Sequence, residues 1–316
     1  MRVVFMGTPE FSVPTLDALL AHHEVIAVVT QPDKRKGRGK AMAFPPVKET
    51  ALAHNIPVYQ PAKVREEDFV ETLRQMAPDV IVVVAFGQIL PESILNIPRY
   101  GCINVHASLL PKYRGAAPMQ WAIINGEEET GITTMYMAKG LDTGDMIDKV
   151  VIPIAPKETG ETLHDKLSAA GGTLILETLS KLEAGTAQRI PQDDAMSSYA
   201  GMLTKDLGEI NWSKSAVEIE RLIRGLNSWP SAYTNCNGKT LKIWDADVVK
   251  EGQEKQEEGQ SVPGTVTAVY KDCFYVQTGD GKLKINEVQL QGKKRMPVQA
   301  FLLGYPVEKG MIYGRS

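Results

Sequence analysis

Cysteine is scarce in this sequence: 316 residues contain only three, Cys102, Cys236 and Cys273, far apart along the chain. They form no CxxC pair and no spacing typical of zinc ligands, which excludes a disulfide-stapled secreted domain and a structural zinc site. A chain of this length can bury a large core without disulfides. We therefore expect three small buried thiols in a reducing compartment.

Long apolar runs are lacking at the start of the chain. The first apolar run, Arg2–Met6, ends at Gly7-Thr8-Pro9 and is too short for a signal peptide or a membrane span. The hydrophobic fraction of 43% and the charged fraction of 23% are ordinary for a globular protein. We expect a cytoplasmic protein without a membrane partner.

Common cofactor motifs are also missing. The first strand opens into Gly7-Thr8-Pro9 rather than GxGxxG, and no Walker A sequence occurs, so neither NAD nor ATP is implied. The sequence has only five histidines, and four of them, His22, His23, His54 and His164, have no ligand spacing. We expect no bound metal.

A strong excess of one charge sign is absent overall, since the net charge is −3, but the distribution is uneven. Residues 1–204 carry 19 basic and 24 acidic side chains, whereas residues 205–316 carry 16 and 14. A basic cluster also lies within the acidic half, between Lys34 and Lys48, with no acid in between. Local positive patches can bind phosphates whatever the total charge.

Short apolar, β-branched runs alternate with helical patterns over the first 150 residues. The expected strands of this alternation are Arg2–Met6, Val25–Thr30, Pro57–Tyr59, Val80–Ala85 and Cys102–Val105. Two further strand candidates, Thr133–Met137 and Ile147–Ile154, flank a Gly/Asp loop. The expected helices are Val13–Ala21, Glu66–Met76 and Glu161–Leu182. This alternation predicts an α/β domain whose parallel sheet is covered on both faces. Ligands bind such sheets at the carboxyl ends of the strands.

The pattern changes after residue 185. Residues 186–208 are polar and interrupted by Gly and Pro, which is typical of a linker. Ala216–Leu226 has the pattern of an amphipathic helix, and strand-like runs follow at Leu241–Ala246, Gly264–Val269, Phe274–Gln277 and Leu283–Val288. Short strands separated by Gly-rich turns predict a small β-barrel. We expect domains at residues 1–185 and 209–316, joined by a linker at 186–208.

The strongest chemical signal follows the strand at 102–105. Asn104 and His106 alternate with Val105, so they point to the same side if the strand continues. Downstream, a glycine loop carries Asp142 between two expected strands, and glycines on both sides allow a positive φ. The simpler reading is that Asn104 caps a turn and His106 is an ordinary buried histidine. Their common position at a strand end favours an active site instead.

Here the sequence resembles a known family. The run Asn104-Val105-His106-Ala107-Ser108-Leu109-Leu110-Pro111, with Tyr113-Arg114-Gly115 and later Gly140-Leu141-Asp142-Thr143-Gly144-Asp145, resembles the signature of folate-dependent formyltransferases. The branch that formylates methionine on tRNA is similar from end to end, including Met6–Phe11, Gly37–Lys40 and Leu226–Pro230. Ala138 departs from the acidic residue of many relatives.

The resemblance implies a Rossmann-like formyltransferase domain followed by an OB-like tRNA-binding domain. It implies transfer of the formyl group of 10-formyltetrahydrofolate to the α-amino group of initiator methionyl-tRNA, giving N-formylmethionyl-tRNA for translation initiation. Asn104 and His106 would then stabilise the oxyanion, while Asp142 would orient His106 and handle the proton. The residues implied in folate binding are Gln88, Ile89, Leu90, Ser108, Leu109, Leu110 and Pro111.

Two features indicate a tRNA acceptor. By resemblance the basic loop enters the acceptor stem, with Arg38 as leading contact beside Lys36 and Lys40. Lys282, Lys284, Lys293, Lys294 and Arg295 are candidates on the barrel. The alternatives are a solvated surface loop, a formyltransferase for a sugar or nucleotide amine, and a non-enzymatic tRNA-binding protein. We expect a monomer.

Overall fold

The computed structural model describes residues 1–36, 41–250 and 261–314, and the chain divides into two compact units. The first unit comprises Met1–Pro118, Glu129–Pro153 and Leu163–Gly201. The second comprises Met119–Glu128, Ile154–Thr162 and Met202–Ser316. Two short segments that precede residue 163 thus belong to the second unit, and most of the stretch expected as a linker belongs to the first.

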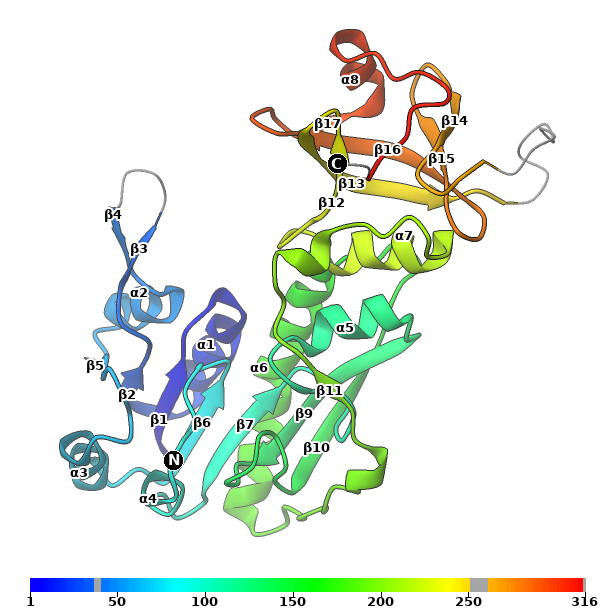
Figure 1. Cartoon of the computed structure of the whole chain (residues 1–316). Helices are drawn as coiled ribbons and strands as arrows, with labels where there is room; N and C mark the ends of the chain where they lie inside the picture. Colours follow the sequence, from blue (N-terminus) through cyan, green and yellow to red (C-terminus); the bar gives the residue numbers. More distant parts are fainter. Residues whose placement is uncertain (37–40, 251–260, 315–316) are drawn as a thin grey trace. The chain divides into compact units, whose positions relative to one another are not determined.

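A seven-stranded sheet forms the centre of the first unit, in the order β10-β9-β7-β6-β1-β2-β5. Five strands run parallel: β7 (Cys102–His106), β6 (Val80–Val84), β1 (Arg2–Gly7), β2 (Glu24–Val29) and β5 (Val58–Tyr59). The expected parallel sheet is confirmed for these strands (Figure 1).

The other two strands of this sheet reverse direction. β9 (Glu129–Tyr136) pairs antiparallel with β7, and β10 (Met146–Pro153) pairs antiparallel with β9. Residues 137–145 join β9 to β10, which is shorter than the crossover of about a dozen residues that parallel neighbours need. The sheet is therefore mixed, and the β9–β10 loop lies beside the parallel strand β7.

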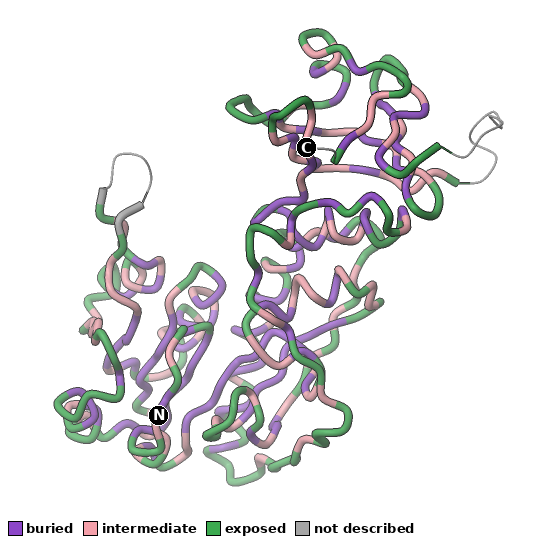
Figure 2. Tube along the Cα trace, viewed as in Figure 1, coloured by how far each residue is buried: buried purple, intermediate pink, exposed green. Residues whose placement is uncertain are grey.

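The central strands are buried on both faces, as Figure 2 shows along their length. One apolar layer joins alternate residues of the strands to α3 (Glu67–Met76): Val4, Met6, Ala27, Val29, Ile81, Val83, Cys102, Phe69, Val70 and Leu73. α1 (Val13–His22) and α6 (Gly160–Ala184) approach each other closely, since a Cβ added at Gly172 would lie 2.9 Å from Pro14 O. Ser168 Oγ of α6 donates to Phe11 O at 2.8 Å. The three helices expected here are confirmed within two residues at each end.

Several short elements of the first unit were not expected from the sequence. They are α2 (Pro46–Ala53), α4 (Glu92–Leu95), the hairpin of β3 (Lys34–Lys36) and β4 (Ala41–Ala43), and the parallel pair of β8 (Arg114–Gly115) and β11 (Tyr199–Ala200). Two 3-10 turns, Glu10–Ser12 and Asp194–Met196, complete the unit. The β8–β11 pair matters for function, because it brings the supposed linker next to the strand end that carries His106.

The second unit contains an antiparallel sheet with the strand order β12-β13-β16-β15-β14, and β17 also pairs with β16. The strands are β12 (Ala232–Cys236), β13 (Lys239–Val248), β14 (Val266–Val269), β15 (Phe274–Gln277), β16 (Lys282–Leu290) and β17 (Met296–Pro297). Its helices are α5 (Pro118–Asn125), α7 (Ala216–Gly225) and α8 (Val298–Gly304), with a 3-10 turn at Asp206–Gly208. The expected C-terminal domain of short antiparallel strands is confirmed, and Phe274, Phe301, Leu241 and Ile285 are fully or nearly fully buried in its core.

The last described residues connect the two outer strands of this sheet. Val266 N of β14 donates to Met311 O at 2.7 Å, and Tyr313 N donates to Gly264 O at 2.9 Å. On the other side, Gly314 N donates to Asn235 O of β12 at 3.3 Å. Residues 311–314 therefore fill the gap between β12 and β14, which is the arrangement that a barrel requires.

The segment 154–162 is tied to the second unit by polar contacts. Lys157 Nζ donates to Ala246 O of β13 at 2.9 Å and pairs with Asp247. Arg224 of α7 donates to Glu158 O at 2.9 Å and to Glu220 Oε1 at 2.6 Å. Both ends of these contacts lie within one compact unit, although they are far apart in the sequence.

Candidate active site

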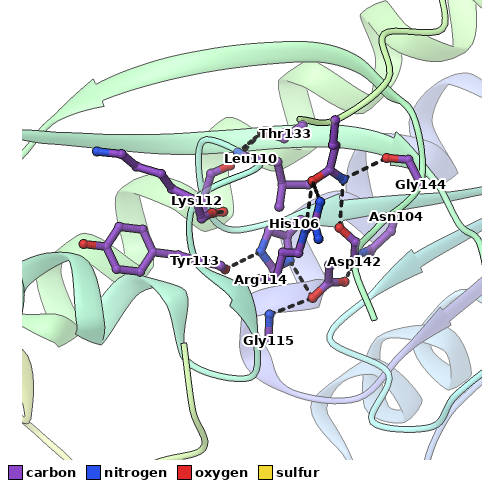
Figure 3. A network of polar contacts seen from close by, with 12 residues as sticks. Asn104, His106, Leu110, Lys112, Tyr113, Arg114, Gly115, Thr133, Asp142 and Gly144 are labelled. Atoms are coloured by element: carbon purple, nitrogen blue, oxygen red, sulfur yellow. Dashed lines mark hydrogen bonds and ion pairs between the residues drawn. The ribbon is translucent and has the colours of Figure 1, made fainter. Parts of the chain in front are cut away.

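Asn104 and His106 lie at the carboxyl end of β7, on the same face as Cys102. Cys102 belongs to the apolar layer below them, whereas the amide and the imidazole lie where that layer ends. Their exposed fractions are only 9% and 6%. The common orientation predicted from their alternation is confirmed, because both side chains reach the same carboxylate (Figure 3).

That carboxylate belongs to Asp142 in the β9–β10 loop. Asp142 Oδ2 lies 3.7 Å from His106 Nδ1 and accepts a hydrogen bond from Gly115 N at 2.8 Å. Asn104 Nδ2 lies 3.5 Å from Asp142 Oδ1. The structure thus brings together the three residues predicted to be catalytic. The positive φ that the sequence suggested for the flanking glycines occurs instead at Asp142 itself, at 52°.

The hydrogen bond at His106 Nε2 determines which edge of the ring can serve the substrate. Nε2 lies 2.9 Å from Tyr113 O, and a carbonyl oxygen can only accept, so Nε2 carries the proton. The other nitrogen, Nδ1, faces Asp142. His106 can therefore donate to a ligand only through Nδ1 of a doubly protonated ring, and Asp142 is placed to balance that charge.

The turn Ser108–Pro111 is held by hydrogen bonds to the residues around it. Ser108 Oγ donates to Lys112 O at 2.7 Å, and Thr133 Oγ1 donates to Ser108 O at 2.7 Å. Ser108 and Leu110 are buried, whereas Leu109 and Pro111 are half-buried. The side chains of Ser108 and Leu110 therefore shape the turn, and Leu109 and Pro111 are the members of this group with accessible surface.

The loop after β6 also contains both exposed and buried residues. Ile89 is 78% exposed, but Leu90 is 2% exposed and belongs to the apolar layer under α3. Gln88 Oε1 accepts from Val64 N at 2.9 Å, which anchors the loop. Of the three residues predicted here to contact folate, Ile89 presents the largest apolar surface.

The basic loop is only partly described. Arg38 and Lys40 lie outside the described residues, and only the backbone of Lys36 is described, at the end of β3. Lys48 is paired with Asp33 at 2.7 Å and donates to Gln60 at 2.8 Å. Because Lys48 is neutralised within its own unit, the predicted tRNA contact falls on the cations of the hairpin.

One of the candidate cations of the second unit is also paired. Arg295 donates to Glu287 at 2.5 Å, and its guanidinium lies 4.7 Å from the centre of the Trp244 ring. Lys293 and Lys294 are exposed, whereas Lys282 and Lys284 are half-buried. Lys293 and Lys294 are thus the most accessible of the five for phosphate contacts.

Three groups that hold the site could not be predicted from the sequence. Tyr113 O and Gly115 N are backbone groups, which no side-chain pattern can reveal. Gln192 Nε2 donates to Asp142 O and to Gly144 O, both at 2.8 Å, from a stretch that was interpreted as a linker. The Tyr113-Arg114-Gly115 part of the family signature was the one available hint.

Over residues 1–36, 41–250 and 261–314, no three or more His, Cys, Asp or Glu side chains cluster as a metal site. Within the same ranges, no helix is both long and apolar enough to cross a membrane. Cys102 and Cys273 are buried as expected, and Cys236 is half-buried. Burial raises the pKa of the Cys102 thiol to about 12, so this thiol is unreactive despite its place below the site.

Comparison with solved structures places the fold. A sugar 3N-formyltransferase, WlaRD, solved in the presence of dTDP and 5-N-formyl-THF, superposes with a TM-score of 0.66 at 20% identity. The match covers 93% of this chain and 99% of that one. At this identity the likeness concerns the fold alone.

Comparison with family models and curated proteins is more specific. Residues 1–179 match the model described as formyl transferase, and residues 202–306 match the formyl transferase C-terminal domain. A protein of Agathobacter rectalis named methionyl-tRNA formyltransferase is 59% identical over 99% of both chains. One of Lachnospira eligens with the same name is 57% identical over 99% of this chain and 100% of that protein. The chain therefore belongs to the formyl transferase family and carries both of its domains.

Proposed function

We propose that this enzyme transfers the formyl group of 10-formyltetrahydrofolate to the α-amino group of initiator methionyl-tRNA, in the cytoplasm and as a monomer. The observation that carries the proposal is the cluster of Asn104, His106 and Asp142 at the end of β7. Relatives named methionyl-tRNA formyltransferase are 57% and 59% identical over 99% of this chain, which supports the choice of acceptor.

The reaction needs no covalent enzyme intermediate. A free α-amine has a pKa of about 8, so a useful fraction of it is neutral and nucleophilic near pH 7. The amine nitrogen forms a bond to the formyl carbon, the formyl oxygen becomes an oxyanion, and the bond to the folate nitrogen then breaks. One proton moves from the attacking nitrogen to the leaving nitrogen, so the exchange is balanced.

The reaction needs stabilisation of the oxyanion and transfer of a proton, and side chains of this protein can supply both. Asn104 has two amide hydrogens, and only one can point to Asp142 Oδ1, so the other can point to the oxyanion. His106 can donate from Nδ1, as its Nε2 proton is used by Tyr113 O. Two such donors each contribute roughly 3–4 kcal/mol to the transition state. Asp142 stabilises the charged imidazole and is the nearby carboxylate that can pass a proton, directly or through water.

Two exposed apolar side chains fit a folate. Ile89 and Leu141 are 78% and 54% exposed, and Leu141 directly precedes Asp142. Exposed apolar side chains next to buried polar ones suit a flat ring that must be held by its faces and fixed by its edges. We propose that Gln88–Leu90 and Ser108–Pro111 hold the donor, with Ile89, Leu109 and Pro111 supplying side-chain contacts and the buried members shaping the loops.

A formylation assay with different acceptors tests the function. With 10-formyltetrahydrofolate as donor, the enzyme should formylate charged initiator tRNA and leave free sugar amines and nucleotide amines unreacted. The His106→Ala variant is the control for background transfer. Preference for a free amine would establish the small-molecule alternative, and binding of tRNA without transfer would establish a non-enzymatic role.

The basic hairpin supports contact with the acceptor stem, and Arg38→Ala tests it. This substitution should impair use of charged tRNA far more than use of folate. Gly37 and Gly39 let the backbone enter a tight space. We therefore expect Arg38→Ala to reduce the difference in formylation rate between initiator and elongator tRNA. If Arg38 contacts only a phosphate, its loss should weaken the binding of both tRNAs equally. The slope of log affinity against log salt concentration should then fall by about one.

The measurement is formylation of both tRNAs by wild type and Arg38→Ala at two salt concentrations. Unchanged kinetics with both tRNAs would show that the basic loop does not contact tRNA and is an ordinary solvated surface loop. The proposed tRNA contact would then depend on the second unit, where Lys293→Ala and Lys294→Ala are the next substitutions to measure.

A further inference from the structure

The side-chain amide of Gln192 uses its full hydrogen-bonding capacity. Its Nε2 donates to Asp142 O and Gly144 O, both at 2.8 Å. Its Oε1 accepts from Nε and from NH2 of Arg114, at 3.0 and 2.9 Å. Reversing the amide would oppose its oxygen to two carbonyl oxygens and its NH2 to a guanidinium. The four partners therefore fix its orientation.

These contacts hold the part of Asp142 that its side-chain contacts do not reach. Asp142 has a φ of 52°, a left-handed conformation that residues with a Cβ rarely adopt. Gly115 N holds Oδ2 of the carboxylate, while Gln192 holds the carbonyl of the same residue and that of Gly144, two positions further along. Separate contacts thus clamp the carboxylate of Asp142 and the backbone that carries it.

Arg114 makes this clamp rigid. Its side chain is only 12% exposed, and it approaches Gln192 Oε1 with two donors, which fixes both position and angle. Because the positively charged guanidinium of Arg114 bonds to the amide oxygen of Gln192, it polarises the amide and strengthens donation by the amide hydrogens. Asp194, its other partner at 2.7 Å, is 83% exposed, so that ion pair adds little.

The same stretch of chain holds the residues that contact His106 and Asp142 from the other side. Ser198 Oγ accepts from Tyr113 N and Ser198 O accepts from Arg114 N, each at 2.9 Å. Ala200 O accepts from Ala116 N at 2.9 Å. Tyr113 O and Gly115 N are the groups that receive His106 Nε2–H and hold Asp142 Oδ2. Residues 190–200 therefore brace both backbone contacts of the catalytic cluster.

We propose that Gln192, oriented by Arg114, is a positioning residue for Asp142, and that residues 190–200 belong to the active site rather than to a linker. This inference rests on the proposed function. Gln192 does not touch the reacting atoms, so its effect must pass through the loop of Asp142 and must concern turnover rather than substrate binding.

The test is Gln192→Glu, which keeps the length of the side chain and its attraction to Arg114. The new carboxylate replaces the two donors with an oxygen facing two carbonyl oxygens, which drives the loop away. We expect kcat to fall by about tenfold to a hundredfold, as for other partners that orient a functional group. The KM values for folate and tRNA should stay within about twofold. Gln188→Glu, the same change at an exposed position two residues before this stretch, should behave as wild type.

A double-mutant cycle shows whether the effect runs through Asp142. In an Asp142→Ala background, Gln192→Glu should have almost no further effect on kcat, because two residues that act as one unit are not additive. An unchanged kcat in the single variant, or an equal loss in both backgrounds, would overturn the proposal. If Gln192→Glu does not fold, Arg114→Lys, which keeps the charge but removes the paired donors, goes through the same cycle with an expected loss of about tenfold.

Hydrogen exchange separates this proposal from the proposed function. In Gln192→Glu the backbone amides of residues 140–145 should exchange faster than in wild type, and in Gln188→Glu they should not. This readout needs no substrate, so it applies even if the wild type formylates no tRNA. Unchanged exchange in this loop would remove the basis of the clamp whatever the activity.

Discussion

Asn104→Ala, His106→Ala and Asp142→Ala should each lower the turnover of tRNA formylation by at least about a hundredfold. In the proposed mechanism, the first two substitutions remove a donor to the oxyanion, and the third removes the carboxylate that faces Nδ1 of His106 and carries the proton. The affinity for tRNA should stay near that of wild type, because all three side chains are nearly buried. Steady-state kinetics and a tRNA binding assay measure the two quantities separately.

Asp145→Asn is the matched control, since it lies three residues further in the same loop. Its carboxylate pairs with Arg189 at 2.8 Å instead of with the cluster, and we expect nearly normal turnover. The Asn104→Ala/His106→Ala double variant should lose less than the sum of the two single losses, because both donors serve one oxyanion. An Asp142→Ala variant with most of its activity intact would show that proton handling lies elsewhere.

Gly144→Ala should cost as much turnover as losing the catalytic carboxylate. A Cβ at this position would lie 1.8 Å from Tyr136 O and 2.9 Å from Tyr136 C, which are backbone atoms that cannot move aside cheaply. The loop must shift, and it carries Asp142 with it. A displacement of about 1 Å in a catalytic group can cost roughly a hundredfold in rate. Kinetics together with thermal melting will separate displacement of the loop from loss of folding.

Gly304→Ala is the appropriate comparison, because nothing lies within 4 Å of an added Cβ there. That variant should keep the turnover and melting temperature of wild type. Normal turnover in Gly144→Ala would mean that the β9–β10 loop can relax without moving Asp142. The clamp from Gln192 would then be weaker than its geometry indicates.

The position of the cluster of Asn104, His106 and Asp142 could be predicted because it obeys short-range rules. Alternation along β7 fixed the common side of Asn104 and His106, and a strand end is where ligands bind in such sheets. Asp142 was found from its glycine loop between two strands. The sequence predicted no direction for the two strands that flank this loop. They run antiparallel to their neighbours, and the loop between them lies beside β7.

Other features had no signal of this kind. Gly115 N and Tyr113 O act through the backbone, so their side chains are not informative. Gln192 is one polar residue in a polar stretch, and only the pairing of β11 with β8 brings it to the site. The solvent exposure of Ile89 and the burial of Leu90 depend on how the loop after β6 leaves the sheet. Neighbouring apolar residues in a sequence cannot reveal which of them will face a ligand.

The contacts of the segment 154–162 have a consequence for modularity. Lys157 and Glu158 are bonded to β13 and α7, so residues far upstream complete the folded body that contains the second family domain. A gene fragment that began at residue 202 would encode Arg224 without the carbonyl of Glu158 and Ala246 without the ammonium of Lys157. Recombination between homologues at that boundary would therefore mix two sets of partners, and exchangeable pieces should include residues 119–128 and 154–162 from the same parent.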